Sequence, residues 1–372
     1  MISTQALVEG LRQKGARLFA GVPDSLLQSL SSYLLRELSP AEHMITANEG
    51  NAVALAMGHY MATGNPGVVY LQNSGLGNCI NPLTSLADRE VYSIPMVLIV
   101  GWRGEPGKKD EPQHVKQGRI TAGQLDLLGI PYWVVDSTAD IDKVLEESWQ
   151  TMQQNSGPVA LLVKANSLDA VSAPELVTDA SLRREDAIGC VLECTSPEDI
   201  VIATTGKAGR ELFELRARRG EAQRDFLTVG GMGHTSSIAL GVALARPERR
   251  VVCLDGDGSL LMHLGAAAIV GDARPRNLIH VLLNNGAHES VGGQPTVART
   301  VDFASIVRAC GYASYHRVDD LASLRQTFGE LDQQGPHFVE VLLAAGSRSD
   351  LGRPTSTPAQ NKQQFMAHIG VN

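Results

Sequence analysis

Aromatic residues are scarce in this sequence: Phe, Trp and Tyr together make up only 5% of its 372 residues. Proteins that bind single-stranded nucleic acid stack bases on aromatic side chains, so this scarcity argues against such a platform. Basic residues are also in the minority, with 32 Lys and Arg against 40 Asp and Glu and a net charge of -8. Without a basic surplus the chain is not expected to bind a phosphate backbone, and we expect no nucleic-acid partner.

Long hydrophobic runs are missing too. The longest apolar run, at 94–100, is far shorter than the ~20 residues that a membrane-spanning helix needs. The start of the sequence shows no basic segment followed by an apolar one, which is the pattern of a secretory signal peptide. The five cysteines are odd in number and scattered, which does not fit a disulfide framework. We therefore expect a cytoplasmic protein with no membrane partner.

Apolar residues and glycine are plentiful, at 43% of the chain and 37 residues respectively. Short β-branched runs without polar alternation recur between helical patterns, as expected of parallel strands that are covered on both faces. We expect strands at 17–20, 44–47, 68–71, 96–100, 132–135, 159–163, 200–203, 251–254, 278–283 and 338–343. Helices are expected at 3–14, from Ser25, at 49–63 and at 260–270.

This alternation predicts two α/β domains, each a doubly wound parallel sheet, because the pattern is interrupted once by a polar stretch. We place the domains at 1–170 and 185–372, joined by a linker at 171–184. Domains usually have about 100–200 residues, so the chain has no room for a third, middle domain.

Polar residues follow two expected strands of the second half, where such sheets place their ligands. Gly256-Asp257-Gly258 follows one strand, and Asn284-Asn285 follows the next. Carboxylate and amide oxygens suit Mg²⁺, and glycines let backbone N–H groups approach a phosphate. A helix expected near Ser259 points its positive end to the same place. The pair predicts a Mg²⁺–diphosphate site, although either motif alone is also an ordinary turn.

The two motifs, in this order and on either side of one helix, resemble the cofactor-binding motif of the thiamine diphosphate-dependent enzymes. The resemblance implies that Mg²⁺ is held by Asp257, Asn285 and the backbone carbonyl of Ala287. Thiamine diphosphate would then lie against Gly256, Gly258 and Ser259.

A second segment, Gly230-Gly231-Met232-Gly233, resembles the part of that family whose apolar side chain lies beneath the cofactor. The resemblance implies that Met232 forces the two cofactor rings into a V and that backbone groups at Gly230 and Met232 hold the aminopyrimidine. Taken alone, the segment is equally compatible with a glycine-rich turn that carries a core methionine.

Thiamine chemistry also needs a carboxyl group at N1′ of the aminopyrimidine. Glu49 follows the expected strand at 44–47 and begins an apolar helix, where burial would raise its pKa as this role requires. A glutamate at that position can also simply complement the helix dipole. The resemblance implies that Glu49 of one chain serves a cofactor held by another, so a homodimer or higher homo-oligomer is expected.

Longer segments resemble the phosphonopyruvate decarboxylase group of this family, at 21–25, 47–52, 72–78, 81–88, 101–106, 110–118 and 346–354. The resemblance implies a carboxy-lyase that converts 3-phosphonopyruvate, an anionic 2-oxo acid, to phosphonoacetaldehyde and CO₂ in phosphonate biosynthesis. Sulfopyruvate decarboxylase and a carboligase of the acetolactate-synthase type remain alternatives. A nucleotide-binding dehydrogenase is disfavoured because the dinucleotide fingerprint does not follow Gly75-x-Gly77.

Two residues of the first half, Asp24 and His114, lie in loops where related decarboxylases place acid–base groups, and we expect them to deliver a proton. For His114 a solvated loop histidine is the alternative. The substrate carries two anionic groups, so several hydrogen-bond donors must converge on it. The candidates follow first-half strands or lie in a tail that could close as a lid: Asn73, Ser74, Arg103, Lys116, Arg348 and Arg353. Each arginine of the tail could equally be solvent-exposed.

Overall fold

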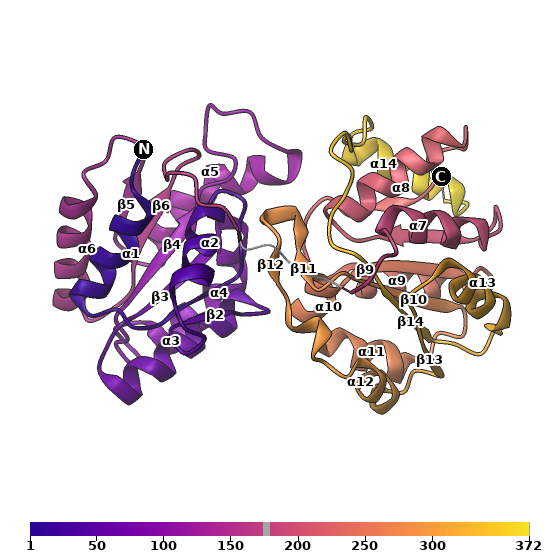
Figure 1. Ribbon diagram of the computed structural model, residues 1–372, viewed down its shortest axis with the longest axis horizontal. Helices are drawn as coiled ribbons and strands as arrows, with labels where there is room; N and C mark the ends of the chain where they lie inside the picture. Colours follow the sequence, from indigo (N-terminus) through magenta and orange to yellow (C-terminus); the bar gives the residue numbers. More distant parts are fainter. Residues whose placement is uncertain (174–178, 372) are drawn as a thin grey trace. The chain divides into compact units, whose positions relative to one another are not determined.

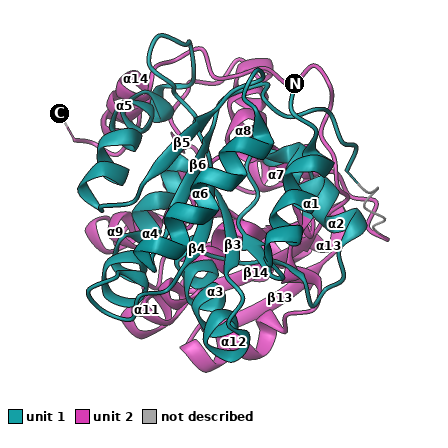
Figure 2. Ribbon diagram, turned by 90° about the vertical axis from the view of Figure 1, so that its left-hand side faces the viewer, with its two compact units in different colours: residues 1–175, 291–294 teal, residues 176–290, 295–372 magenta. Residues whose placement is uncertain are grey.

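The computed structural model describes residues 1–173 and 179–371 (Figure 1). They form two compact units (Figure 2). The first unit holds residues 1–173 with Val291–Gln294, and the second holds 179–290 and 295–371. Part of the predicted linker, 174–178, lies outside the described residues, as does residue 372 of the second predicted domain. No helix within the described ranges is both long enough and apolar enough to span a membrane.

The first unit is built on a six-stranded sheet with the order β2-β1-β3-β4-β6-β5, in which every pairing is parallel. Its strands are β1 (Phe19–Gly21), β2 (His43–Ile45), β3 (Gly67–Gln72), β4 (Met96–Gly101), β5 (Tyr132–Val135) and β6 (Val159–Val163). The chain leaves β1 to one side and returns on its other side at β3. Such a reversal is where doubly wound sheets bind ligands at the carboxyl ends of their strands.

Helices cover both faces of this sheet. The helices are α1 (Thr4–Lys14), α2 (Gln28–Glu37), α3 (Glu49–Thr63), α4 (Leu76–Pro82), α5 (Pro112–Leu127) and α6 (Ile141–Asn155), with short turns η1 (Asn73–Gly75) and η2 (Leu83–Ala87). The ends of α1, α3 and α6 agree with capping residues in the sequence. The helix predicted at 49–63 is confirmed: Asn48 accepts a hydrogen bond from the N–H of Gly50, and Gly64 ends the helix in a left-handed conformation. The helix predicted from Ser25 begins later, at Gln28.

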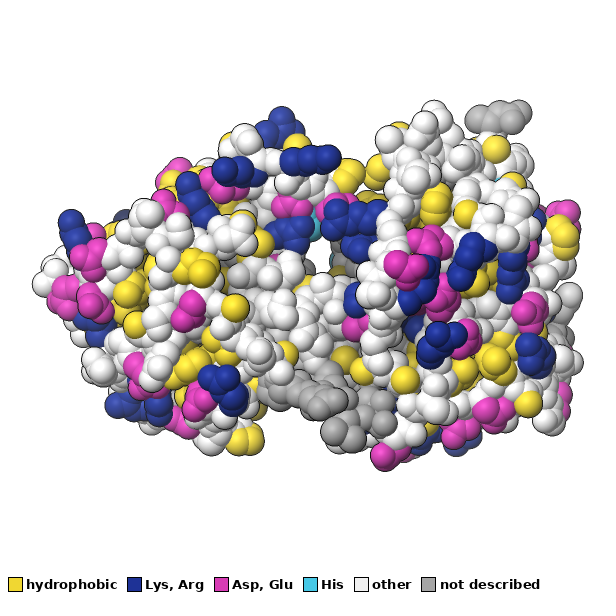
Figure 3. Space-filling model, turned by 45° about the horizontal axis from the view of Figure 1, so that its top comes forward, with side chains coloured by type: hydrophobic (Ala, Val, Ile, Leu, Met, Phe, Trp, Pro, Cys, Tyr) yellow, Lys and Arg dark blue, Asp and Glu magenta, His cyan; other side chains and the backbone are white. Residues whose placement is uncertain are grey.

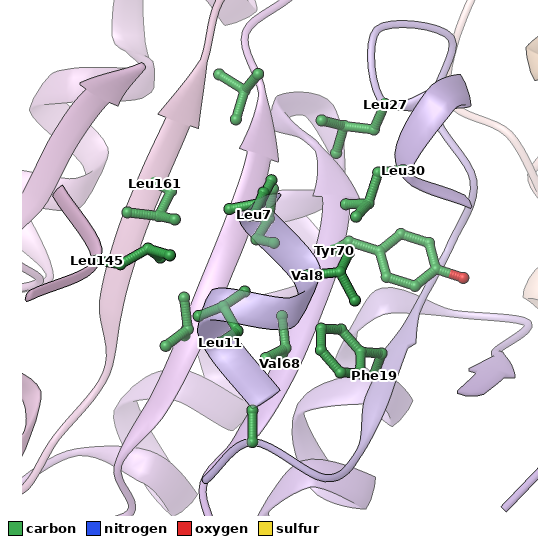
Figure 4. Close-up of a cluster of buried hydrophobic side chains, with 14 of the residues drawn as sticks. Leu7, Val8, Leu11, Phe19, Leu27, Leu30, Val68, Tyr70, Leu145 and Leu161 are labelled. Carbon is green, nitrogen blue, oxygen red and sulfur yellow. The ribbon is translucent and has the colours of Figure 1, made fainter. Parts of the chain in front are cut away.

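Alternate residues of each strand serve opposite faces of the sheet. Val68 and Tyr70 of β3 pack with α1 and α2, whereas Val69 and Leu71 belong to the cluster beneath α3 and α4. Figure 4 shows the first cluster, with Leu7 of α1 over the strands. Burial of each large apolar side chain contributes about 1.5–3 kcal/mol. The sheet is therefore fixed from both sides, which holds the loops at its carboxyl edge in place.

The second unit repeats the plan with a parallel sheet of the order β13-β14-β10-β9-β7-β8. Its strands are β7 (Ile200–Ala203), β8 (Phe226–Leu227), β9 (Val251–Gly256), β10 (Leu278–Asn284), β13 (Ser314–Val318) and β14 (His337–Leu342); the short β11 (Ala287–His288) and β12 (Gln294–Pro295) lie outside this sheet. Every predicted strand of both halves is present, with ends that agree within two residues, and the α/β fold with two doubly wound parallel sheets is confirmed. The edge strands β8 and β13 were not predicted.

The helices of the second unit are α7 (Arg184–Glu193), α8 (Lys207–Arg218), α9 (Thr235–Ala245), α10 (Asp257–Met262), α11 (Gly265–Ala273), α12 (Phe303–Cys310), α13 (Leu321–Glu330) and α14 (Pro358–His368), with turns η3 (Glu289–Val291) and η4 (Val297–Arg299). The single helix predicted at 260–270 is wrong. The backbone of His263 leaves the helical region at φ -132° and ψ 50°, so α10 ends and α11 begins two residues later. The first turn of α10 already includes Asp257, Gly258 and Ser259.

The surface carries both signs of charge. On the face in Figure 3, Lys and Arg side chains lie among Asp and Glu side chains in several places. This distribution agrees with the net charge of -8.

Candidate active site

Glu49 is the first residue of α3, just beyond the carboxyl end of β2, and is only 5% exposed. Its Oε2 accepts a hydrogen bond of 2.7 Å from Nδ2 of Asn78. Burial raises the pKa of Glu49, and the hydrogen bond from Asn78 opposes part of that rise. A carboxyl group with a raised pKa can hold a proton and share it with a neighbouring base near neutral pH.

The room for this side chain comes from a glycine. A Cβ atom at Gly75 would lie 2.4 Å from Oε1 of Glu49, a distance at which no carbon atom can be placed. Gly75 lies in the turn between β3 and α4, so the sequence that follows β3 provides both the space and, through Asn78, the hydrogen-bond donor. Sequence reasoning found Glu49 but did not connect Gly75 or Asn78 with it.

Asp24 follows β1 and is fully buried. Its Oδ2 accepts a hydrogen bond of 3.1 Å from the N–H of Leu26, and its Oδ1 has no partner among the described residues. Burial raises the pKa of Asp24 to about 6, and the charge of Arg103 opposes part of the rise. A buried carboxyl group that titrates near neutral pH and has an unpartnered oxygen is suited to proton transfer.

His114 lies in the first turn of α5 and is 8% exposed. Its Nδ1 lies 2.9 Å from Oδ1 of Asp110. Burial lowers the pKa of His114, whereas the hydrogen bond with Asp110 raises it, and the net shift is downward. The alternative of a solvated histidine is not what the structure shows, because the ring is buried and paired.

The predicted substrate cations differ in their surroundings. The guanidinium of Arg103 binds both carboxylate oxygens of Asp110 and donates to Oγ of Ser25 over 2.7 Å. Arg348 pairs with Glu185, Glu214 and Asp350. Lys116 is exposed on α5, two residues beyond His114, and Arg353 is exposed in the tail.

The two predicted polar contacts after β3 also differ. Asn73 is buried, and its Nδ2 donates to the carbonyl of Arg103 (2.8 Å) and to Oγ1 of Thr121 (2.9 Å). Asn73 thus ties the turn after β3 to the loop after β4. Ser74 is exposed and accepts a hydrogen bond of 2.6 Å from Gln72.

In the second unit, Asp257 begins α10 and is 3% exposed. Its Oδ2 accepts a hydrogen bond of 2.6 Å from Oγ1 of Thr296, and burial raises its pKa. Gly256 precedes it, with its N–H donated to Oδ1 of Asp255 over 2.9 Å. That N–H is therefore engaged, and what Gly256 offers a ligand is the absence of a side chain.

Asn285 follows β10 and is 4% exposed. Its Nδ2 donates to Oε2 of Glu289 over 2.8 Å, and its Oδ1 accepts from the N–H of Ala287 over 3.1 Å. These two bonds fix which end of the amide is oxygen. A hard cation needs oxygen ligands, so a fixed Oδ1 beside the buried carboxylate of a neighbouring strand fits Mg²⁺.

Glu289 is held in turn by two cations. Oε2 accepts from Arg184 over 2.5 Å, and Oε1 lies 2.9 Å from Nζ of Lys207. Burial opposes ionisation, but Arg184 and Lys207 together keep the pKa of Glu289 below its usual value. Arg184 also pairs with both oxygens of buried Glu211. Sequence reasoning missed this ion network because its members are separated by up to 105 residues.

Thr204 was also missed. It follows β7, is 4% exposed, and its Oγ1 has no hydrogen-bond partner among the described residues. Its methyl group lies 3.6 Å from the position that a Cβ at Gly256 would take. A buried hydroxyl without a partner is costly, and a phosphate oxygen would satisfy it. With Asp257 and Asn285 close by at the same sheet edge, these residues fit a diphosphate and its cation.

The segment around Met232 is linked to the same place. The N–H of Gly233 lies 3.2 Å from Oγ of Ser259, in the first turn of α10. Gly231 and Gly233 adopt positive φ angles of 67° and 90°, which favour glycine. Met232 between them is half-buried.

Comparison with known proteins indicates the same cofactor. Residues 1–125 match the N-terminal TPP binding domain of the thiamine pyrophosphate enzymes, and residues 204–341 match the C-terminal TPP binding domain. Phosphonopyruvate decarboxylases of Streptomyces viridochromogenes and Streptomyces hygroscopicus are 38% and 36% identical, over 99% and 98% of this chain and 95% and 93% of theirs. Sulfopyruvate decarboxylase of Methanosarcina acetivorans is 30% identical, over 99% of this chain and 97% of its own.

Both binding domains are matched, and full-length relatives exceed 30% identity over nearly their whole length. The resemblance that the sequence motifs indicated is confirmed, and the chain belongs to the thiamine pyrophosphate-dependent decarboxylase family.

Proposed function

We propose that this protein decarboxylates 3-phosphonopyruvate to phosphonoacetaldehyde and CO₂, as a carboxy-lyase of phosphonate biosynthesis. The observation that carries the proposal is the similarity, over almost the full length, to two proteins named phosphonopyruvate decarboxylase. The relative named sulfopyruvate decarboxylase is less similar, at 30% identity. The buried carboxyl groups of Glu49 and Asp257 support the chemistry, because each suits one half of the same cofactor.

Thiamine pyrophosphate, when bound, supplies a sink for the electron pair that is left when CO₂ departs. We assign residues 1–170 to binding its pyrimidine and residues 185–372 to binding its diphosphate. Asp257, Asn285 and the carbonyl of Ala287 would hold Mg²⁺. Contacts to the cofactor would come from Gly230, Met232, Gly256, Gly258, Ser259 and the hydroxyl of Thr204.

Glu49 would hold a proton at its carboxyl group for the pyrimidine ring, which its raised pKa favours. Asp24 and His114 would move a proton to the carbon that loses CO₂. Asp24 is suited to this because it titrates near neutral pH, with a pKa of about 6. The burial of all three groups keeps water away from the protons that they carry.

For the anionic tail of the substrate we favour Lys116 over Arg103 and Arg348, and Arg353 stays a candidate from the tail. Arg103 and Arg348 already bind carboxylates within the chain. Lys116 is exposed and lies close in sequence to His114, on the same helix. We retain Asn73 and Ser74 as candidate substrate contacts, because they lie in the turn that follows β3.

A panel of substrates tests the reaction. The protein with thiamine pyrophosphate and Mg²⁺ would be offered 3-phosphonopyruvate, sulfopyruvate and pyruvate, with CO₂ release and trapped aldehyde as readouts. We expect the highest kcat/KM with 3-phosphonopyruvate. Equal or faster turnover of sulfopyruvate would overturn the phosphonate assignment in favour of the sulfonate. An acyloin as the main product from pyruvate would indicate a carboligase.

We also propose that the enzyme is a homodimer or higher homo-oligomer in which each site takes Glu49 from one copy and Asp257 from another. Mixing inactive Glu49→Gln and Asp257→Ala variants then restores activity, because a mixed pair holds one intact site. Random exchange in a dimer should return about a quarter of the wild-type rate. No recovery after unfolding and refolding together would contradict the shared site.

The five unpaired cysteines support our placement of the protein in the reducing cytoplasm.

A further inference from the structure

Asp110 accepts an unusual number of hydrogen bonds for a residue in the loop between β4 and α5. Arg103 donates to Oδ2 from Nε over 2.9 Å and to Oδ1 from Nη2. The N–H groups of Gly104 and Glu111 donate over 2.8 and 2.7 Å, and Nδ1 of His114 lies 2.9 Å from Oδ1. Neither the sequence motifs nor the comparisons assign this residue a role.

This environment decides the protonation of both partners. Burial disfavours the charge, but Arg103, His114 and the backbone donors hold the pKa of Asp110 well below its usual range. An ionised carboxylate only accepts hydrogen bonds, so the nitrogen of His114 that faces it must carry the proton. The neutral ring then has its lone pair on Nε2, the nitrogen that points away from Asp110.

We propose that Asp110 is a positioning residue that holds His114 in the tautomer with its proton on Nδ1, so that Nε2 exchanges a proton with the substrate. Arg103 is the anchor of Asp110 in this arrangement and does not bind the phosphonate. The inference deepens the proposed function and rests on the role given there to His114.

Three observations support this assignment over a purely structural one. Arg103 uses its forked guanidinium on both oxygens of Asp110, a geometry that leaves Oδ1 aimed at His114. The same guanidinium donates to Ser25, the neighbour of Asp24, so one cation connects the loops of both proposed proton carriers. The charged groups that face His114 are Arg103, Asp110 and Glu111, and Asp110 is the one in direct contact with its ring.

The tautomer can be measured without turnover. Protein labelled with ¹⁵N-histidine gives imidazole resonances that distinguish a protonated nitrogen from a bare one, and His114→Asn assigns the signal. We expect Nδ1 protonated and Nε2 bare at pH 7.5. In Asp110→Asn, whose side chain can also donate, the Nδ1-protonated form should fall. A wild-type ring protonated on Nε2 would overturn the proposal, even if Asp110→Asn did not fold.

Kinetics give a second measurement. In Asp110→Asn we expect kcat to fall about 10- to 100-fold, the usual effect of losing an orienting partner. The limb of the pH profile that reports His114 should move to lower pH, because the carboxylate raises the pKa of that ring. Asp126→Asn, on the exposed side of the same helix, is the matched control and should behave like wild type. Unchanged kcat and pH profile in Asp110→Asn would contradict the positioning role.

Arg103→Lys distinguishes an arginine that anchors Asp110 from one that binds substrate. Lysine keeps the positive charge but lacks the forked guanidinium that binds both oxygens of a carboxylate. We expect kcat to fall while KM for 3-phosphonopyruvate stays within about twofold. A large rise in KM with kcat retained would show that Arg103 binds substrate. If the wild-type protein does not turn over 3-phosphonopyruvate at all, the proposed function fails, while the tautomer measurement still decides the relation between Asp110 and His114.

Discussion

Asn78 donates a hydrogen bond of 2.7 Å to Glu49, so the buried carboxyl group at the start of α3 is held by a side chain from α4. The bond restrains the carboxyl group on one oxygen, Oε2, and stabilises its charged form. Burial acts in the opposite direction and prevails, which leaves the pKa of Glu49 above its ordinary value. The balance of these two effects sets how readily this acid shares its proton.

Glu49→Gln should keep the shape of the side chain and remove its proton. We expect thiamine pyrophosphate to bind with nearly wild-type affinity in calorimetry, whereas kcat falls about 10²- to 10⁴-fold, the range for losing an acid–base group. Glu90→Gln, an exposed glutamate of the same unit, is the control and should retain full activity. Wild-type turnover in Glu49→Gln would refute the acid assignment.

Gly75→Ala tests the space that Glu49 occupies. The added methyl group would lie 2.4 Å from Oε1, so Glu49 or the turn must move, and we expect kcat to drop at least about tenfold. Gly77→Ala is the matched control, because a methyl group there meets no atom within 4 Å. If both alanine variants have equal activity, the close approach of Gly75 to Glu49 does not matter for catalysis.

Asp24→Asn should stabilise the protein at neutral pH while removing activity. The folded-state pKa of Asp24 is raised to about 6 from 3.8, so its contribution to stability is present below pH 4 and lost as the pH rises through 6. Two pKa units correspond to about 3 kcal/mol. Chemical denaturation at pH 4.5 and pH 8 should show most of this loss in the wild type and a smaller pH dependence in Asp24→Asn. The same pH dependence in both proteins would contradict the shift.

Asp257→Ala should abolish the Mg²⁺-dependent retention of the cofactor. We expect the affinity for thiamine pyrophosphate in the presence of Mg²⁺ to fall at least about 100-fold, because the cation loses its carboxylate ligand. Calorimetry with and without Mg²⁺ measures this effect. Asp272→Ala, an exposed residue on α11, is the control. An unchanged Mg²⁺ dependence in Asp257→Ala would exclude it as a ligand.

Glu289→Gln should act on the metal site through Asn285. The neutral amide of glutamine accepts the hydrogen bond from Nδ2 of Asn285 less strongly than the carboxylate of Glu289 does, so Asn285 is held less firmly. We therefore expect Mg²⁺ affinity to fall about 10- to 100-fold. It also weakens the ion pairs of Arg184 and Lys207, which should cost up to about 3 kcal/mol of unfolding free energy. Thermal unfolding and Mg²⁺ titration separate the two effects. Reduced stability with unchanged Mg²⁺ affinity would mean that Glu289 supports only the fold.

Local signals predicted most of the fold. The helix at 49–63 is predicted from its richness in Ala and Met, and in the structure Asn48 and Gly64 cap its ends. The edge strand β13 was missed because Ser314-Tyr315-His316-Arg317 is largely polar, as the half-exposed edge of a sheet permits. No glycine or proline lies at 260–264 around the interruption at His263, and the single glycine at 265 is compatible with one continuous helix.

The residues of the site fall into two groups, those that sequence motifs predict and those that only the folded chain brings together. Glu49, Asp257 and Asn285 follow strands in motifs that the sequence displays, whereas their supports come from distant segments. Asp110 and Arg103 pair only when the loop after β4 folds back on itself. Glu289 pairs with Arg184, which lies 105 residues away in the sequence. Pairings of this kind are set by tertiary packing and leave no spacing to recognise.

The ion pairs of Arg348 have a practical consequence for anyone who shortens this protein. Arg348 lies among Glu185 of α7, Glu214 of α8 and Asp350. Truncation before this residue would remove the arginine that Glu185 and Glu214 share, and would also remove Phe365 from an apolar cluster. Purification handles are therefore better appended after α14 than exchanged for it.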